Sequence, residues 1–249
     1  MYFKEALDKK QPVGCFWLSL GSIPLAEFIA ETSETSQAPL AVVFDMQHGL
    51  WDRMALENAI GLIKTGLIPL VRVADCDRFH ISGALDAGAE GVIVPLIETA
   101  EQARNAVQYT NYPPEGTRSA GGVRPIRDFA AYVDMARKTT AVALMIETRT
   151  GLENIAEIIE TPGLDMIFIG TGDLCLSLGL TKDDPALEQA FGKIKRTCDA
   201  ANVPCGIFTP DVTQAKRRQE QGFLLVVLSD DITANRTLYQ EKTREFTAN

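Results

Sequence analysis

Short apolar runs rich in β-branched residues recur along this chain, with amphipathic segments of helical length between them. This alternation is typical of parallel βα units and not of a β-sandwich. The runs are apolar on both faces, as strands must be when they lie between a barrel interior and a coat of helices. There are eight, at Gly14–Leu18, Leu40–Phe44, Ile68–Val73, Gly91–Val94, Val142–Ile146, Met166–Ile169, Cys205–Phe208 and Leu224–Leu228.

Eight units of this kind predict a closed (β/α)8 barrel, whereas six or seven would fit an open doubly wound sheet equally well. The count depends on the first unit, so the open sheet remains the alternative. The length of 249 residues matches one barrel, and no segment has the composition of a linker. We therefore expect a single α/β domain, a TIM barrel over residues 1–249. Thr150 is expected to cap a helix over Gly151–Ile159.

Charge and cysteine usage narrow the choice of partners. The formal net charge of -9 argues against nucleic acid, because binding a phosphate backbone needs clustered Lys and Arg. The five cysteines are scattered and never spaced as Cys-x-x-Cys, so neither a disulfide framework nor a thiolate zinc site is predicted. No run approaches the roughly 20 apolar residues that span a bilayer, and no secretory signal is evident. We expect a cytoplasmic protein with no membrane partner.

The active site of such a barrel lies at the carboxyl ends of its strands, so polar residues directly after each apolar run are the first functional candidates. Arg72 lies within the third run, where a guanidinium is costly to bury unless it meets an anion. The other candidates are Asp45, Gln47 and His48 after the second run, Glu147 after the fifth, Gly170, Thr171, Gly172 and Asp173 after the sixth, Thr209 after the seventh, and Ser229 and Asp230 after the eighth.

Glu147 and Asp173 follow neighbouring runs, so their carboxylates can converge on one divalent cation. Ligands that are all oxygen favour Mg, Mn or a similar ion. Each carboxylate alone could instead cap a helix or pair with an arginine, but their joint placement favours the metal. The Gly170–Asp173 segment also offers backbone N–H groups to a substrate carboxylate, although a tight turn needs glycine in any case.

The chain has two histidines, so the choice of a general base is narrow. His48 follows Asp45 by three residues, and we expect that carboxylate to orient the imidazole and raise its basicity. A surface histidine is the alternative for His48, and an exposed helix position is expected for His80. No lysine ends an apolar run, so a Schiff-base mechanism lacks its nucleophile and a metal must supply the electrophile in an aldolase.

Five segments together resemble the sequence blocks of the HpcH/HpaI aldolase/citrate lyase family in order and spacing. They are Phe44–Gly49, Gly88–Leu96, Tyr112–Ser119, Ile146–Arg149 and Phe168–Leu174. The resemblance runs from about Gly14 to the last helix. It implies a barrel of the phosphoenolpyruvate/pyruvate superfamily that binds Mg, Mn or Co, handles 2-oxo acids and is oligomeric. We expect a trimer or hexamer, with the last helix exchanged with a neighbouring subunit.

The resemblance also implies roles for individual residues. Glu147 and Asp173 would bind the metal, and Arg72 would hold an enolate oxygen. Asp45 and His48 would together manage the proton during aldol cleavage or formation of a 4-hydroxy-2-oxo acid, which gives pyruvate and an aldehyde. The chain departs from the family pattern at Gln47, where Glu is usual, at Met145, where Gln is usual, and at Thr171-Gly172, where Pro-Ala is usual. Substrate, metal preference or reaction can therefore differ.

The acceptor aldehyde is not named by the sequence, but two loops are candidates for binding it. They are Pro113–Arg118, with Arg118 as the residue facing substrate, and Thr209–Asp211; both also fit simple turns. A related lyase acting on a CoA ester is one alternative, and it would need a basic rim beyond Arg217-Arg218. A barrel that binds its ligand without turnover is another.

Overall fold

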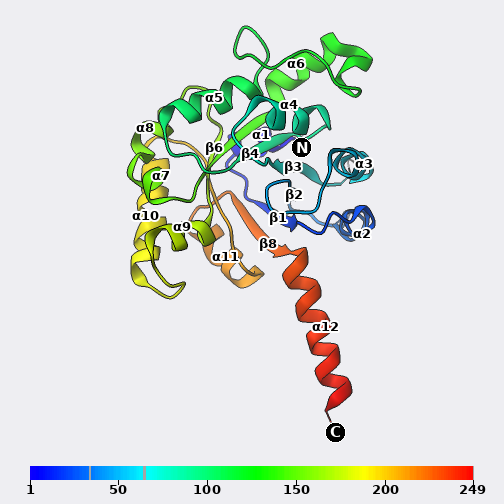
Figure 1. The fold of residues 1–249 in the computed structure, drawn as a ribbon, viewed down its shortest axis with the longest axis vertical. Coiled ribbons are helices and arrows are strands. Elements are labelled where there is room, and N and C mark those ends of the chain that lie inside the picture. The colour runs from blue at the N-terminus through cyan, green and yellow to red at the C-terminus, as the bar shows by residue number, and fades with distance from the viewer. Residues whose placement is uncertain (34, 64–65, 249) are drawn as a thin grey trace.

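Eight parallel strands pair in chain order, and β8 closes the ring against β1 (Figure 1). The computed structural model describes residues 1–33, 35–63 and 66–248. The predicted (β/α)8 barrel is confirmed, and the open sheet is excluded. The strands are β1 Val13–Leu18, β2 Leu40–Asp45, β3 Ile68–Arg72, β4 Gly91–Val94, β5 Ala141–Ile146, β6 Met166–Ile169, β7 Cys205–Ile207 and β8 Leu225–Asp230.

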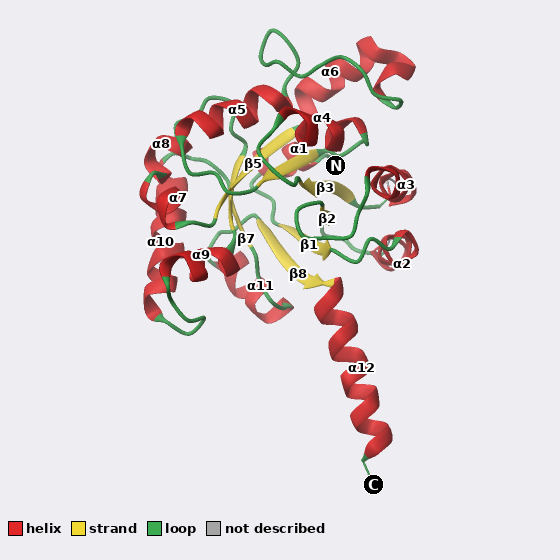
Figure 2. Cartoon of the chain, viewed as in Figure 1, coloured by secondary structure: helices red, strands yellow, loops and turns green. Residues whose placement is uncertain are grey.

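Helices surround the strands, with the first at the amino end of the barrel and the last projecting away from it (Figure 2). They are α1 Phe3–Asp8, α2 Ile23–Ser33, α3 Arg53–Ile63, α4 Arg78–Asp86, α5 Ala100–Thr110, η1 Pro125–Asp128, α6 Phe129–Thr139, α7 Arg149–Glu153, α8 Ile155–Ile159, α9 Thr171–Leu178, α10 Pro185–Ala200, α11 Val212–Glu220 and α12 Asp231–Thr247.

The strand bounds agree with the sequence prediction to within one residue except at the end of β8, and the helix after β5 also begins at a different residue. The apolar run of the last strand ends at Leu228, but β8 continues to Asp230 because its backbone still pairs with β1 there. Ser229 and Asp230 therefore lie inside the strand and not after it. Thr150 is not a cap: the Thr148 hydroxyl accepts the Gly151 N–H, so the helical segment begins two residues earlier than predicted. It also divides at Asn154 into two helices, α7 and α8, where one was predicted.

The core has two layers, as the two-sided apolar strands predict. Inward side chains such as Val43, Leu70 and Phe168 fill the barrel, and α1 closes its amino end with Phe3 and Leu7. A second cluster packs the outward strand faces against the helices. All five cysteines are free thiols, and four are buried.

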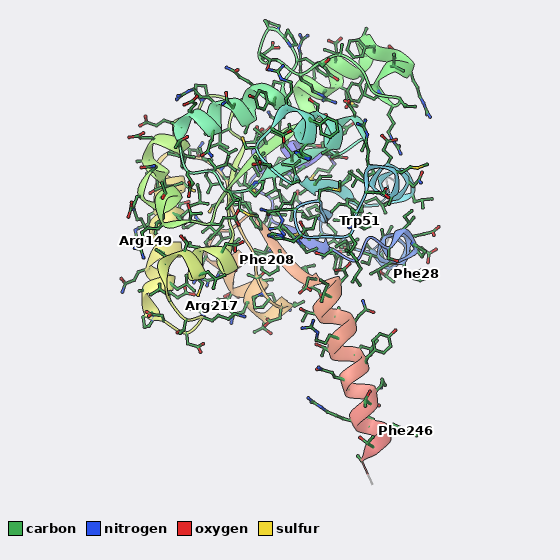
Figure 3. The ribbon with its side chains drawn as sticks, viewed as in Figure 1. Phe28, Trp51, Arg149, Phe208, Arg217 and Phe246 are labelled. Carbon is green, nitrogen blue, oxygen red and sulfur yellow. The ribbon has the colours of Figure 1, made fainter. Side chains whose placement is uncertain are left out.

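The last helix, α12, leaves the barrel beside β8 and runs away from the rest of the molecule (Figure 1). Within it only Asp231 is buried. Phe246, near its far end, is 90% exposed (Figure 3). Over the described part of the chain, no helix combines the length and the apolar character needed to cross a membrane.

Candidate active site

An ion pair between Asp45 and Arg72 lies at the carboxyl ends of β2 and β3, where the two residues stand in register. The Arg72 Nε donates to Asp45 Oδ1 at 2.9 Å, and Nη2 donates to Oδ2 at 2.5 Å. Asp45 is 2% exposed and Arg72 8% exposed. Asp45 is therefore the anion that compensates the burial of Arg72 in the third strand. The contact is bidentate and does not use Nη1.

Asp45 accepts more hydrogen bonds than this pair requires. The Trp17 indole and the Ser19 hydroxyl both donate to Oδ2 at 3.3 Å, and the backbone N–H groups of Gln47 and His48 donate to Oδ1 at 3.1 Å. Burial alone would raise the pKa of Asp45, but the hydrogen bonds and charge of Arg72, together with the other donors, lower it below its usual value. Asp45 is thus held as an anion that orders its surroundings.

Trp17 and Asp231 were missed by the sequence analysis. The Trp17 ring lies 5.1 Å from the Arg72 guanidinium carbon and stacks on Phe168 with 5.8 Å between ring centroids. The Asp231 carboxylate accepts the backbone N–H groups of Ser19 and Leu20, and so fixes the loop that follows β1. The available signals were a tryptophan next to a strand end and an acidic residue opening a helix.

Glu147 follows β5 directly and is 1% exposed. Its Oε1 accepts the Leu96 N–H at 2.8 Å, whereas its buried Oε2 has no hydrogen-bond partner among the described residues. A Cβ on Gly170 would lie 2.5 Å from Oε2, so only glycine fits there. Burial, opposed by the Leu96 hydrogen bond and reinforced by the nearby Asp173 charge, raises the pKa of Glu147 to about 7.

Asp173, in the first turn of α9, lies near enough to Glu147 for its charge to add to that rise in pKa. The described residues contain no group of three or more His, Cys, Asp or Glu side chains suited to a metal. The two carboxylates, one of which has an unpartnered buried oxygen, nevertheless fit a hard divalent cation whose other positions would be filled by water and substrate oxygens.

His48 is arranged differently from the expectation. The residue is exposed, and its contact with Asp45 is made by the backbone N–H. The Asp45 carboxylate is already occupied by Arg72, Trp17 and Ser19. Asp45 therefore fixes the loop that carries His48. Contrary to the expectation, its carboxylate does not orient the described His48 imidazole ring.

The remaining candidates near the mouth have separate contacts. Gln47 has a buried Oε1 without a partner among the described residues, and the Met145 sulfur would lie 3.1 Å from a Cβ on Gly170. The Thr171 hydroxyl donates to the Phe208 carbonyl, and the buried Thr209 hydroxyl donates to the Val227 carbonyl. A Cβ on Gly172 would meet no atom within 4 Å, so the start of α9 is open there.

Arg118 is not brought to this group. Its side chain is fully buried, its Nη2 donates to Asp86 at 2.8 Å, and its guanidinium lies over the rings of Tyr112 and Tyr132. Asp86 ends α4, and helices of a βα barrel end at the face opposite the carboxyl ends of the strands. The observed contacts of Arg118 therefore join helices at the amino end of the barrel.

Comparison with known proteins gives a consistent result. The family model for HpcH/HpaI aldolase/citrate lyase matches residues 25–235. A hydroxypyruvate/pyruvate aldolase from Paraburkholderia phytofirmans is 32% identical over 92% of this chain and 91% of its own length. A 5-keto-4-deoxy-D-glucarate aldolase from Salmonella newport is 30% identical, with 98% and 96% covered. A solved structure from Burkholderia cenocepacia, described as a protein of the same family, superposes with a TM-score of 0.89 at 31% identity, covering 98% of each chain.

Proposed function

This chain belongs to the HpcH/HpaI aldolase/citrate lyase family, and we propose that it is a metal-dependent carbon–carbon lyase. Its substrate is a 4-hydroxy-2-oxo acid, which it cleaves to pyruvate and an aldehyde or forms in the reverse direction. Pyruvate and hydroxypyruvate aldolases among its relatives support this reaction class.

The observation that carries the proposal is the buried Glu147 carboxylate. Its Oε2 has no partner in the described protein, and Asp173 lies beside it with a second carboxylate. A buried charged oxygen left without a partner is costly, so such an atom indicates a ligand that completes it. Mg, Mn or Co bound by Glu147 and Asp173 would polarise the keto oxygen of a 2-oxo acid and stabilise the enolate.

The chain's own residues supply the rest. Arg72 is held on Asp45 through Nε and Nη2, so its Nη1 can donate to the oxygen that gains charge as the C3–C4 bond breaks. The open start of α9, from Gly170 to Gly172, can receive the substrate carboxylate on backbone N–H groups. His48, exposed on the loop that Asp45 fixes, takes the proton from the C4 hydroxyl directly or through one water.

A coupled assay for pyruvate tests this function. Purified protein stripped of metal would be given a panel of 4-hydroxy-2-oxo acids with and without Mn²⁺. We expect pyruvate release that requires the ion and is lost in Asp173→Asn. Substrate binding without release on the whole panel would indicate a barrel that binds without turnover.

A lyase for CoA esters is the competing function, and the charge distribution does not support it. Nucleotide phosphates require a basic rim, for which Arg217-Arg218 was the one sequence candidate. Arg218 is buried, paired with Glu188 and set over Phe191. Only Arg217 of the two remains exposed on α11 (Figure 3).

We further propose that the protein is a homo-oligomer in which α12 packs on a second copy of the chain. The helix carries exposed Leu238, Tyr239 and Phe246. Large apolar side chains that are exposed on a helix running away from its own barrel favour burial in a partner. Light scattering should give a mass of three or six chains, and Tyr239→Ser with Phe246→Ser should reduce it. A monomeric parent protein would contradict this assignment.

A further inference from the structure

Leu96 has an unusual backbone conformation for its residue type. Its φ is +55°, and among the described residues only Lys10 and Asn202 are other non-glycine residues with positive φ. Those two follow α1 and α10, where a left-handed residue commonly ends a helix. Leu96 instead follows β4, at the carboxyl end of the barrel, where no helix end accounts for its conformation.

Burial of the Leu96 side chain does not explain the conformation either. Leu96 is 43% exposed, so its side chain is not enclosed by the core. Its backbone, by contrast, makes a specific contact: the Leu96 N–H donates to Oε1 of Glu147 at 2.8 Å. Leu96 thus adopts a strained conformation, and the contact that this conformation provides is one hydrogen bond to a buried carboxylate. Strain of this kind indicates a function for that bond.

The two residues that follow Leu96 are held in place by contacts of their own. The Ile97 N–H donates to the Met145 carbonyl at 3.3 Å, and Ile97 is fully buried. The Glu98 carbonyl accepts the Asn154 side chain at 2.8 Å. A Cβ on Gly151 would lie 2.6 Å from the Ile97 carbonyl, so the loop runs directly against the segment that follows Glu147. These contacts hold the loop where a left-handed Leu96 points its N–H at Glu147.

We propose that Leu96 is a positioning residue for the metal site: its left-handed backbone pins Oε1 of Glu147 and thereby turns Oε2 towards the cation. This inference rests on the proposed function, because it takes Glu147 as a metal ligand. The Leu96 side chain itself has no role in it. The conformation of the backbone matters, so tolerance at this position should follow the ease of adopting positive φ.

A substitution series separates backbone from side chain. Gly and Asn adopt the left-handed conformation readily, and Ala does so about as well as Leu, whereas β-branched Ile and Val resist it. We expect Leu96→Gly, Leu96→Asn and Leu96→Ala to bind Mn²⁺ within about threefold of the parent. We expect Leu96→Ile and Leu96→Val to bind about 10-fold more weakly or worse, as is typical when a partner of a metal ligand is lost.

Mn²⁺ binding is measured on purified protein by electron paramagnetic resonance or calorimetry, without substrate. Lys10→Ile and Lys10→Gly are the matched controls, since Lys10 has φ +51° but precedes β1 at the opposite end of the barrel. Lys10→Ile should lower thermal stability as Leu96→Ile does, yet leave the dissociation constant for Mn²⁺ unchanged.

The outcomes are distinct. If Ile and Val bind like the parent while Ala, Gly and Asn bind weakly, the side chain matters and the assignment is overturned. Equal binding across the whole series also overturns it. If the Ile and Val variants fail to fold, Ala, Gly and Asn still decide, because loss of affinity in them contradicts the backbone role. Absence of Mn²⁺ binding by the parent protein would overturn the metal site itself, and the inference with it.

Discussion

Two buried arginine–aspartate pairs lie at opposite ends of this barrel and share much of their chemistry. Arg72 pairs with Asp45 and lies over Trp17, and Arg118 pairs with Asp86 and lies over Tyr112 and Tyr132. Sequence alone made both arginines candidates for contact with substrate. The two pairs differ in what surrounds them.

The pair at the carboxyl end neighbours an incomplete site. Asp45 collects four further donors besides Arg72, and the charge of Arg72 reaches Glu147, whose Oε2 has no described partner. Arg118 is enclosed by two tyrosine rings and ties α4 to α6. A buried ion pair alone does not mark function, because many such pairs only hold elements together. Position at the strand ends, next to an uncompleted carboxylate, is what distinguishes Arg72.

Metal removal should have the largest effect on activity, and this effect should arise at the carboxyl end alone. A chelator should abolish turnover, and Mg, Mn or Co should restore it, because the carboxyl end offers only hard oxygen ligands there. Glu147→Gln should weaken Mn²⁺ binding first, since it removes one anionic ligand at constant size. Titration of Mn²⁺ against both proteins checks this. Full activity after exhaustive chelation would show that turnover needs no metal at Glu147 and Asp173.

The same substitution at both arginines tests the comparison directly. Arg72→Lys should lower kcat by about 30-fold to 1000-fold, the effect of about 2–4 kcal/mol of lost transition-state stabilisation, because an ammonium cannot reproduce the guanidinium fork. Arg118→Lys should instead lower the free energy of unfolding by about 1–3 kcal/mol, since it leaves buried partners unsatisfied.

Steady-state kinetics and urea unfolding on both variants give the two readouts. The expected pattern is an Arg72→Lys whose loss of kcat persists per folded molecule, and an Arg118→Lys that is less stable but active per folded molecule. A rate for Arg72→Lys within about threefold of the parent would count against its role on the enolate.

The pH dependence of stability in the metal-free protein tests the raised pKa of Glu147 at the carboxyl end. The pKa of Glu147 rises from 4.5 to about 7, so between these values the native state keeps a proton that the unfolded chain has lost. That proton stabilises the native state at low pH, and the stabilisation, roughly 3 kcal/mol at most, is lost as the pH rises through about 7. Asp45, with its lowered pKa, contributes in the opposite direction and only where the pH falls below its usual value.

Urea unfolding at about pH 5 and about pH 8, in chelator, measures the Glu147 contribution. The parent should lose more stability over this interval than Glu147→Gln, which cannot titrate at that position. Bound Mn²⁺ should remove the difference, because the cation takes the place of the proton. An identical pH dependence in parent and variant would show that Glu147 is ionised already at low pH.

The fold was predictable, and so was the end of the barrel at which the candidate residues lie, because both follow from local pattern. Two-sided apolar runs marked each strand, and the residue after a run lands at one end of the barrel. The proximity of Glu147 and Asp173 was predicted this way. The resemblance to a known family suggested the roles that we propose for them.

Contacts between distant segments were not predictable in the same way. Asp231 holds the loop after β1 across more than two hundred residues of chain, and the Arg118 contact with Asp86 spans 32. Nothing local to either residue names its partner. The left-handed Leu96 was also hidden, because leucine gives no signal of positive φ, as a glycine would.

The smallest expected effect concerns Gln47 and Met145, where the chain departs from the pattern of the family it resembles. Gln47 has a buried oxygen without a described partner, and Met145 faces Gly170 beside Glu147. Compared with Glu and Gln at these positions, Gln47 and Met145 make the carboxyl end of the barrel less anionic and more apolar. The natural aldehyde should accordingly be larger or less polar than hydroxylated or succinate-semialdehyde partners.

Gln47→Glu with Met145→Gln should therefore shift preference towards those polar aldehydes and keep the enzyme active. The reason is that both changes add polar groups next to Glu147 without removing Arg72, Asp173 or the Leu96 contact. The quantity to measure is the ratio of kcat/KM values across a panel of polar and apolar aldehydes, since a general loss of activity would cancel in the ratio. An unchanged ratio would mean that Gln47 and Met145 only fill space, and the acceptor would then have to be chosen by other residues of the mouth.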